Sequence, residues 1–527
     1  MAAAIGLDTT FIEGNLFVYG AINGPGQPIQ PVGADPFGID DSTAAITSVF
    51  TQAASGLEAH IPCGIYKITK PIAISITSKA APHIGGGGQD CTILWFSGTN
   101  GISVSFADQW TSALFSDMTL ATDDTTGSYT ALQWNTPKAV VYGQNIAFST
   151  NVVRNVLYRG LDAYTTNNEY WGTGFTETNV SFINIDHGGF WGAKQITSGV
   201  SISAASPAVV TMTNNFPANF PVILGGTLPT GLTSGKVYFV TAPTSAHFNL
   251  ANVPGGAALN TSGSATTTAT IQAYGLGNAI SLQGSTALPS YSVVVNIHGF
   301  NAGGCYQGLY YGDFLQGVVV DSGTNIGCSI GVTTINGPVG TPDELAIADS
   351  AFETAVAAVN TYGFNGLFVH HNTFVLDGGV GLQGFGNGFF IDHNFLQFSS
   401  LPPSGAATVG INMNVSTASR GTIEANSIGN ANTDIAVTPA TYAYANILYN
   451  FEPNGPVKYS INASALGTRI IDNYLGLTSG LPACNGGTEG AQFQVYDASG
   501  PTYNGTLSGS GGAVVPVTCN GTNWTTH

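Results

Sequence analysis

The sequence predicts an all-β protein, most of it a parallel β-helix, in which each turn of the chain adds one short strand to several parallel sheets. Two observations lead to this fold class: the composition and a repeat of about one turn's length. Only 8% of the 527 residues are charged, against roughly 25% in ordinary soluble domains. Because Lys, Glu and Arg normally cover the solvent sides of helices, this composition excludes a mainly helical protein. The 43% of hydrophobic residues exclude a disordered one.

The net charge of −18 at pH 7 excludes nucleic acid and anionic membranes as partners, because both are bound through clusters of Lys and Arg. The N-terminus shows neither the basic start nor the apolar stretch of a signal peptide, and no run of about 18 apolar residues predicts a membrane span. The composition, rich in Asn, Thr, Ser and Gly, is nevertheless typical of an extracellular protein. A virion protein released by host lysis would satisfy both observations.

The six cysteines predict no metal site, because they are widely spaced and form no Cys-x-x-Cys pair. Cys484 and Cys519 flank one short segment near the C-terminus and could form a disulfide. The alternative is that all six cysteines are buried free thiols. We expect neither a metal nor a cofactor.

A helix followed by strands is predicted after a Gly- and Pro-rich lead or anchor over residues 1–34. The helix would begin at Asp41 or Ser42 and end at Gly56. Its buried side is formed by residues at helical spacing, which are Ile46, Val49, Phe50 and Ala53. Alternating apolar residues then indicate short strands around residues 57–61 and 66–68. A lone helix of this kind would cap the open end of a strand stack and protect its unpaired edges.

A six-residue pattern with asparagine in fourth place begins at residues 369, 391, 423 and 470, and a serine-bearing relative begins at residue 347. The first two steps are 22 residues, which is about the length of three short strands and their turns. Asn372, Asn394 and Asn426 would therefore stack as a ladder at one corner, and the wider steps of 32 and 47 residues would carry loops. Residues 343–359 also show helical spacing, so a loop helix there is the alternative.

The helix-and-strand segment resembles the entry segment of the pectate-lyase-like superfamily, the right-handed parallel β-helices. In that family two aspartates precede an Ala-rich helix, which is followed by Gly, a strand, Pro-x-Gly-x-Tyr and another strand. The matching residues here are Asp40, Asp41, Ala44, Ala45, Ala53, Gly56, Pro62, Gly64 and Tyr66. The resemblance covers about 40 residues and implies the fold, not the reaction.

Residues 196–272 interrupt the repeats and contain neither Asp nor Glu. Their Leu-Pro-x-Gly-Leu turn, Tyr-containing strand and Pro-Gly-Gly-Ala turn resemble a small β-domain inserted in many phage tail and surface proteins. The C-terminal residues, from Cys484 to Trp524, resemble a short β-unit that ends phage tail proteins. We therefore expect a lead (1–34), a first β-helix part (35–195), an inserted β-domain (196–272), a second β-helix part (273–475) and a C-terminal β-unit (476–527).

Together these three likenesses resemble a bacteriophage tailspike. That resemblance implies a homotrimer on the virion, joined to other tail proteins through its N-terminus. It also implies binding, and often cleavage, of host surface polysaccharide.

Hydrolysis of a polysaccharide needs two carboxylates, about 5–5.5 Å apart in retaining enzymes and about 6.5–9.5 Å apart in inverting ones. Neighbouring strands lie about 4.8 Å apart, so acids on the same or adjacent turns fall in this range. Seven of the 29 acidic residues lie within residues 313–377. The catalytic residues predicted from this group are Asp321, Asp349, Glu353 and Asp377. The alternatives are solvated surface acids and contacts between protomers.

Aligning the repeats by their asparagines gives two more columns. One holds Asp349, His371 and His393, and the other holds Ala348, His370, Asp392 and Glu424. An Asp-His-His column could tune a proton donor. The alternative, which we favour for the histidines, is that they hydrogen-bond around the turn.

Aromatic side chains near acids are candidates for sugar contact, because their faces stack on the apolar faces of sugar rings. The predicted substrate-binding residues are Trp171, Trp191, Tyr310, Tyr311 and Asp313. Trp171 and Trp191 lie near a second acidic group that includes Asp186. The alternative is that these rings belong to the core.

The function predicted from these features is recognition and hydrolysis of host capsule, O-antigen or exopolysaccharide by a carboxylate pair. A receptor-binding fibre or capsid-decoration protein without enzyme activity is the alternative. A polysaccharide lyase is third, because only four arginines occur and none is paired with a lysine as uronate elimination would require. The polygalacturonase signature is also missing as a set; Asp186-His187-Gly188-Gly189 is an isolated fragment of it.

Overall fold

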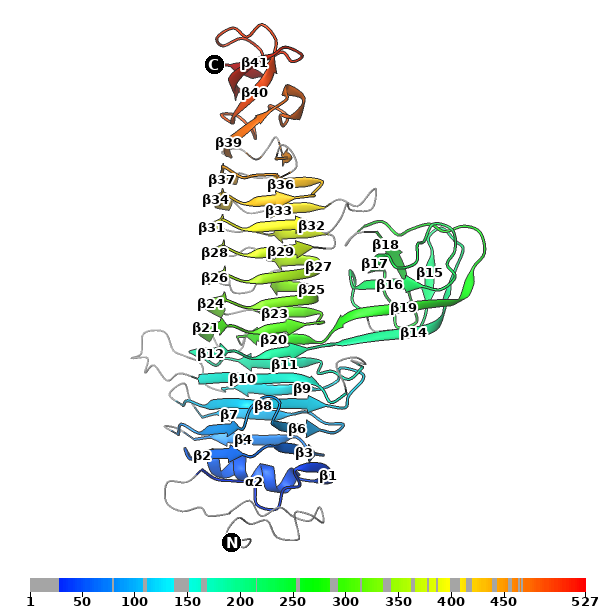
Figure 1. Cartoon of the computed structure of the whole chain (residues 1–527), viewed down its shortest axis with the longest axis vertical. Helices are drawn as coiled ribbons and strands as arrows, with labels where there is room; N and C mark the ends of the chain where they lie inside the picture. The colour runs from blue at the N-terminus through cyan, green and yellow to red at the C-terminus, as the bar shows by residue number, and fades with distance from the viewer. Residues whose placement is uncertain are drawn as a thin grey trace. The chain divides into compact units, whose positions relative to one another are not determined.

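The computed structural model describes residues 28–77, 80–107, 111–136, 151–162, 168–214, 216–252, 256–284, 292–312, 315–334, 343–361, 365–376, 379–384, 387–398, 408–413, 419–437, 443–453, 457–462, 465 and 468–527. These residues are mostly in strands, with one α-helix (Figure 1). The chain divides into two compact units. The first comprises Met1–Gln195 and Tyr274–Cys328, and the second comprises Ile196–Ala273 and Ser329–His527.

The first unit is a stack of parallel strands arranged in three ladders. One ladder contains β2 (Glu58–Ile61), β5 (His83–Gly86), β8 (Leu114–Thr122), β10 (Asn151–Gly160), β12 (Ile183–Asp186), β21 (Ser292–His298) and β24 (Leu315–Asp321). A second contains β1 (Phe37–Asp41), β3 (Gly64–Ile68), β6 (Thr92–Phe96), β13 (Gly189–Trp191), β22 (Asn301–Gly303) and β25 (Thr324–Thr334). The long strands β8 and β10 turn a corner and pair in both ladders.

The third ladder of the first unit contains β4 (Ile72–Ile76), β7 (Ile102–Phe106), β9 (Thr130–Asn135), β11 (Thr173–Thr178), β20 (Asn278–Gln283) and β23 (Gln307–Tyr311). Every pairing in the three ladders is parallel. The inward side chains alternate with outward ones and form an aromatic core. In it the ring of Trp134 lies 5.4 Å from those of Phe106 and Phe175. This is the predicted parallel β-helix.

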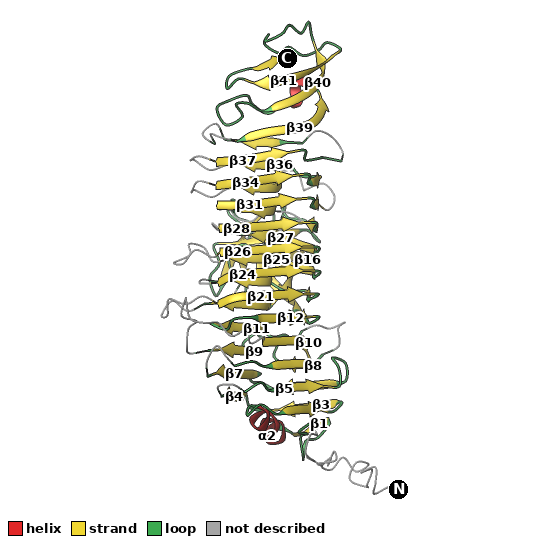
Figure 2. Ribbon diagram, turned by 90° about the vertical axis from the view of Figure 1, so that its left-hand side faces the viewer, coloured by secondary structure: helices red, strands yellow, loops and turns green. Residues whose placement is uncertain are grey.

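The predicted entry helix is confirmed as α2 (Thr43–Ala53), which lies at the first turns of the stack (Figure 2). Its four predicted inward residues are buried, and the ring of Phe50 lies 6.0 Å from that of Phe115. Ser42 is at the N-cap but bonds Asp35 instead of the helix, while Oδ1 of Asp41 accepts the main-chain N–H of Thr43 at 3.0 Å. No described helix is long and apolar enough to cross a membrane.

The second unit also contains ladders of parallel strands. One ladder contains β26 (Asp343–Ala348), β28 (Asn365–His370), β31 (Asn387–Asp392), β34 (Ser419–Glu424), β37 (Ala443–Leu448) and β39 (Arg469–Gly476). A second ladder contains β27 (Ala351–Asn360), β29 (Thr373–Leu376), β32 (Phe395–Phe398) and β35 (Ser427–Gly429). A third contains β30 (Val380–Gln383), β33 (Val409–Met413), β36 (Thr433–Val437) and β38 (Tyr459–Ile461), and the long strand β27 also pairs with β30 in it.

The structure rules out the loop-helix alternative for this ladder and corrects the expectation about its longest step. Residues 343–359 form strands β26 and β27 instead of a loop helix, because strand pairing on the stack overrides the helical spacing. The 47-residue step is not one turn with a loop. It is two turns, since β37 lies between β34 and β39.

Antiparallel structure occurs in two further segments. A closed barrel is formed by β14 (Ala193–Ile202), β15 (Val209–Thr211), β18 (His247–Ala251), β17 (Val237–Thr241), β16 (Pro221–Gly225) and β19 (Thr266–Leu276). Near the C-terminus, β40 (Gln492–Ala498), β41 (Ala513–Cys519) and β42 (Trp524–Thr526) pair antiparallel.

The expectation of six free thiols is wrong in this structure, because all six cysteines are joined in pairs. The disulfides are Cys63–Cys91, Cys305–Cys328 and Cys484–Cys519. Only the last had been considered from the sequence. The first two join residues 28 and 23 positions apart, about one turn of the β-helix, which brings each pair together on neighbouring turns.

Candidate functional site

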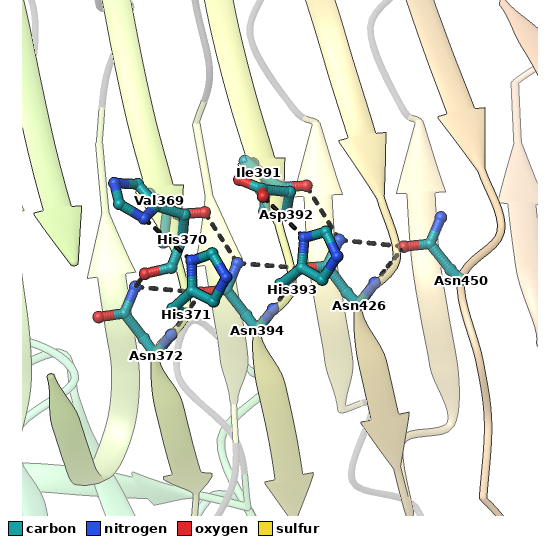
Figure 3. Close-up of polar contacts among 10 residues, drawn as sticks. All are labelled: Val369, His370, His371, Asn372, Ile391, Asp392, His393, Asn394, Asn426 and Asn450. Atoms are coloured by element: carbon teal, nitrogen blue, oxygen red, sulfur yellow. Dashed lines mark hydrogen bonds and ion pairs between the residues drawn. The ribbon is translucent and has the colours of Figure 1, made fainter. Parts of the chain in front are cut away.

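The repeated asparagines form a hydrogen-bonded ladder at one corner of the second unit (Figure 3). Nδ2 of Asn372 donates to Oδ1 of Asn394 at 3.0 Å, and Nδ2 of Asn394 donates to Oδ1 of Asn426 at 2.9 Å. Asn426 donates in turn to Oδ1 of Asn450 at 3.0 Å. The predicted ladder is therefore confirmed and contains one more member than the sequence pattern showed.

The residues just before this ladder take the left-handed backbone conformation. Asp349, His371 and His393 have φ angles of 48°, 56° and 51°. Asp, Asn and His tolerate that conformation better than most residues, which explains their recurrence here. The first of the two predicted columns therefore lies at a sharp corner of the β-helix. Its residues are of types that adopt the backbone conformation of this turn.

The second predicted column is confirmed by the strand register. Ala348 pairs with His370, His370 with Asp392, and Asp392 with Glu424. Ile391 and Ile423, which precede the two acids, are fully buried, so the acids face outward. The backbones of neighbouring parallel strands are about 4.8 Å apart, so the side chains of Asp392 and Glu424 leave the sheet from adjacent positions.

Asp392 is held by its corner neighbour. Its Oδ2 lies 2.8 Å from Nδ1 of His393, whose ring stacks on that of His371 with centroids 5.2 Å apart (Figure 3). The side chain of Asp392 is 11% exposed, and its Oδ1 is buried with no hydrogen-bond partner among the described residues. A buried carboxylate oxygen without a partner costs free energy. A ligand hydroxyl or a proton shared with a neighbouring acid would supply the missing partner.

Two exposed phenylalanines lie on the same outer face, two residues before the acid column. Phe368 is 43% exposed and Phe390 is 37% exposed, and the two are register partners on β28 and β31. On β34 the corresponding residue is Thr422. Rings about one strand spacing apart form an apolar surface of the kind that stacks on sugar rings. The site thus combines an aromatic pair with a carboxylate pair on three neighbouring strands.

The acids that the sequence predicts as catalytic in this unit are not part of the Asp392 and Glu424 pair. Asp349 is exposed at the corner, and Glu353 is exposed on β27. The register places Val375, not an acid, beside Glu353 on the next turn. Asp377, the intended partner of Glu353, lies outside the described residues. The catalytic roles of Asp349 and Glu353 stay predictions.

Asp321, the fourth predicted acid, lies in the first unit at the end of β24. There its carboxylate is bonded to Nδ1 of His298. The register also aligns His298 with Asp186, and Asp186 with Arg154. The structure therefore brings together Asp186 and Asp321, which the sequence places in two separate acidic groups.

The structure contradicts sugar contact for Trp171 and Tyr311, which are fully buried. Nε1 of Trp171 donates to the carbonyl oxygen of Leu120 at 2.9 Å, and the Tyr311 hydroxyl donates to that of Leu315 at 3.1 Å. Because each polar atom finds an internal partner, these large side chains can fill the core. The core alternative is correct for both residues.

The remaining predicted contacts are on the first unit. Trp191 is 39% exposed, and its ring packs over Gly303 on the next turn. Tyr310 is half-buried. Both stay candidates for sugar contact, and Asp313 lies outside the described residues.

A separate pair of acids is buried in the second unit. Asp434 is fully buried and Glu452 is 3% exposed, and Nζ of Lys458 lies 3.5 Å from Oε2 of Glu452. Burial raises the pKa of Asp434 to about 7; the Glu452 carboxyl adds to this rise, while the main-chain N–H and the charge of Lys458 oppose it. Because both carboxyls are covered, we assign this pair to the core.

Sequence reasoning placed Asp392 and Glu424 in one column but did not select them as catalytic. It missed Phe368 and Phe390 entirely. The signal was available: once Val369 and Ile391 are taken as inward, strand alternation turns their neighbours outward. Asp186 and His298 could not be joined from sequence, because the inserted barrel separates them.

No protein-family model matches the chain, and no curated protein sequence matches it. Among solved structures, it is similar to a DFA-IIIase from Arthrobacter chlorophenolicus A6, at 12% identity and a TM-score of 0.46, over 84% of this chain and 98% of that one. It is also similar to PfbA, a surface adhesin of Streptococcus pneumoniae (9% identity, TM-score 0.39, 85% and 93% covered). A third is the catalytic unit of a GH87 α-1,3-glucanase from Streptomyces thermodiastaticus strain HF3-3 (11%, 0.38, 86% and 70%).

These similarities are too low to carry a substrate or a reaction to this chain. Its own fold and surface define the class: a parallel β-helix protein with paired acids, histidines and exposed aromatic rings on one sheet face.

Proposed function

We propose that this chain binds a surface polysaccharide along the outer face of β28, β31 and β34 and hydrolyses it there, with Asp392 and Glu424 as the catalytic pair. The observation that carries the proposal is their register as direct neighbours, with the exposed rings of Phe368 and Phe390 two residues away along the strands. The strand spacing of about 4.8 Å between them is close to the carboxyl separation of about 5–5.5 Å in retaining glycosidases.

In this scheme a sugar ring stacks on the phenylalanines and presents its glycosidic bond to the acids. Glu424 protonates the leaving oxygen while Oδ2 of Asp392, oriented by His393, bonds to the anomeric carbon and the glycosidic C–O bond breaks. Glu424 then takes a proton from a water molecule. The water oxygen displaces Asp392, which restores both carboxyl groups.

A receptor-binding protein that does not cut is the second candidate. The burial of Asp392 favours it, because a covered carboxylate must become accessible before it can attack. Under this candidate the phenylalanines and Glu424 would still bind the sugar.

The proposal extends to the particle that carries the chain: a homotrimeric phage tailspike, joined to the tail through its N-terminus and acting outside the host. The support for this part is the sequence resemblance of the entry segment, of residues 196–272 and of the C-terminal segment. Analytical ultracentrifugation of the purified chain tests it. A mass of three chains supports the proposal, and a monomer at micromolar concentration contradicts it.

The enzymatic proposal is tested by incubating the chain with capsule, O-antigen and exopolysaccharide preparations and measuring released reducing ends. We expect release by the wild type, loss of at least 100-fold in Glu424→Gln and Asp392→Asn, and weaker binding in Phe390→Ala. Glu489→Gln, an exposed acid of the same unit, is the matched control and should keep full activity.

Three other results are informative. Binding without release identifies the non-cutting alternative. Ultraviolet absorbance from an unsaturated sugar identifies a lyase. If Glu353→Gln or Asp349→Asn abolishes release while Glu424→Gln does not, the catalytic pair proposed here is wrong.

A further inference from the structure

A cluster of potential metal-binding side chains lies on the first unit, whereas the acids assigned to hydrolysis belong to the second. Asp186, His187 and His298 each offer one ligand atom, and these atoms lie within 4.8 Å of one another. Asp186 and His298 are register partners on β12 and β21, and His187 follows Asp186 at the corner. Three ligands therefore come from two neighbouring turns of a rigid stack.

The two imidazole rings are already oriented. Nδ1 of His298 is bonded to the carboxylate of Asp321 on the next turn, which leaves Nε2 of that ring as the ligand atom. A carboxylate on the far nitrogen of a histidine fixes the ring and strengthens it as a metal ligand. The ring of His187 is T-shaped to that of His298, with centroids 5.1 Å apart. Gly299, at the next corner, leaves room for it.

The charge around the cluster favours a cation. Asp186 and Asp321 lie on alternate turns of one column with His298 between them. The nearest arginine in that column, Arg154, has its guanidinium 3.9 Å from Asp117 on the preceding turn. Oδ1 of Asp186 and Nδ1 of His187 lie 2.5 Å apart, so a cation could replace the proton that they share.

We propose that Asp186, His187 and His298 bind one divalent transition-metal ion, such as Zn²⁺ or Co²⁺, with Asp321 orienting His298. Two imidazoles and a carboxylate favour these ions over Ca²⁺ or Mg²⁺, which prefer oxygen ligands only. Ligand atoms bound about 2 Å from one ion lie within about 4 Å of one another, so closing the site requires about 1 Å of movement by exposed side chains. The cysteines take no part.

The test uses the full chain without a histidine tag. Co²⁺ is titrated and followed by visible absorption, which reports four-coordinate binding directly, and Zn²⁺ is titrated by calorimetry. We expect one equivalent per chain and at least a tenfold loss of affinity in His187→Ala and His298→Ala. Asp321→Asn should keep the stoichiometry and lose roughly 10- to 100-fold in affinity.

The matched control is His83→Ala. His83 is also beside a carboxylate, with Nδ1 3.4 Å from Glu58, but no second histidine belongs to that pair. Its removal should leave Co²⁺ affinity unchanged. Should His298→Ala unfold, His298→Gln replaces it. The proposal is overturned by a wild type that binds no Zn²⁺ at millimolar concentration, or by unchanged affinity in the His187 and His298 variants. Since the readout is metal binding, failure of the hydrolase proposal leaves this test intact.

Discussion

Nδ2 of Asn394 donates a hydrogen bond at 2.9 Å to Oδ1 of Asn426, a residue 32 positions further along the chain and one turn away in the stack. The same nitrogen also donates to the main-chain carbonyl of Val369 on the preceding turn, at 2.8 Å. One side chain thus ties three successive turns together at the corner beside the proposed site. The geometry of the acids depends on this corner, because His371 and His393 occupy its left-handed positions.

Asn394→Ala should destabilise the second unit by about 2–4 kcal/mol. The change removes four buried hydrogen bonds, because Nδ2 of Asn394 donates two and its Oδ1 accepts two from Asn372. A buried partner left unsatisfied costs about 1–3 kcal/mol. Thermal unfolding followed by circular dichroism measures the effect. Asn260→Ala, an exposed asparagine of the same unit, is the control and should leave the melting temperature unchanged. Equal melting temperatures for the two variants would contradict a structural role for the ladder.

Stability should depend on pH through Asp434. Burial raises its pKa from 3.8 to about 7, so the folded protein keeps this proton where the unfolded chain has lost it. The stability contribution is therefore complete below pH 4 and is lost as the pH rises through 7, by a few kcal/mol at most. Asp434→Asn should remove this loss. Unfolding of both proteins at pH 5 and pH 8 measures it, with Asp90→Asn as the exposed control.

A melting-temperature difference between the two pH values that is as large in Asp434→Asn as in the wild type would contradict this assignment. It would mean that other groups dominate the pH dependence in that window.

No thiol should react in the unreduced, denatured protein, because all six cysteines are paired. Reduction should lower stability, since each disulfide closes a segment of 23–35 residues and such loops contribute about 3–4 kcal/mol in the chain-entropy model. A thiol reagent in denaturant, with and without prior reduction, counts the thiols. Six reactive thiols without reduction would restore the free-thiol alternative.

The two tryptophans proposed from sequence should respond differently to substitution. Trp171→Ala should cost about 3–5 kcal/mol of stability, because its buried ring packs 5.9 Å from that of Phe96. Trp191→Ala should leave the melting temperature nearly unchanged, since its ring is 39% exposed. Calorimetric melting of both variants tests this. A similar loss of stability in both would show that the ring of Trp191 also serves the core.

The fold class follows from the sequence because the corner asparagines recur at turn length and strand alternation is strict around them. The turn containing Asn450 escaped detection for a physical reason. Its segment places Glu452 where the repeats have an apolar residue such as Ile428. That acid is tolerated because it lies beside Lys458 and beside Asp434, whose pKa is raised by burial. Because a polar residue occupies this core position, the segment does not match the apolar pattern by which the other turns are recognised.

The candidate site was only half accessible to sequence reasoning. Spacing placed Asp392 beside Glu424, and the structure confirms that relationship. The grouping of Asp321 with Asp349 stays a prediction, because Asp321 belongs to the first unit and Asp349 to the second. Sequence could not distinguish Trp171 from Trp191, because both are next to glycine in an aromatic segment. In the structure Trp171 is fully buried, whereas Trp191 is 39% exposed.

The stereochemistry of the first-formed product tests the central claim most directly. The proposal makes Asp392 the nucleophile and Glu424 the acid and base, so cleavage must retain the anomeric configuration. Proton NMR of the reaction in its first minutes shows which anomer appears before mutarotation. Retention by the wild type, with no product from Glu424→Gln, is the predicted result. Inversion would contradict the account, because an inverting enzyme forms no bond between a carboxylate and the anomeric carbon.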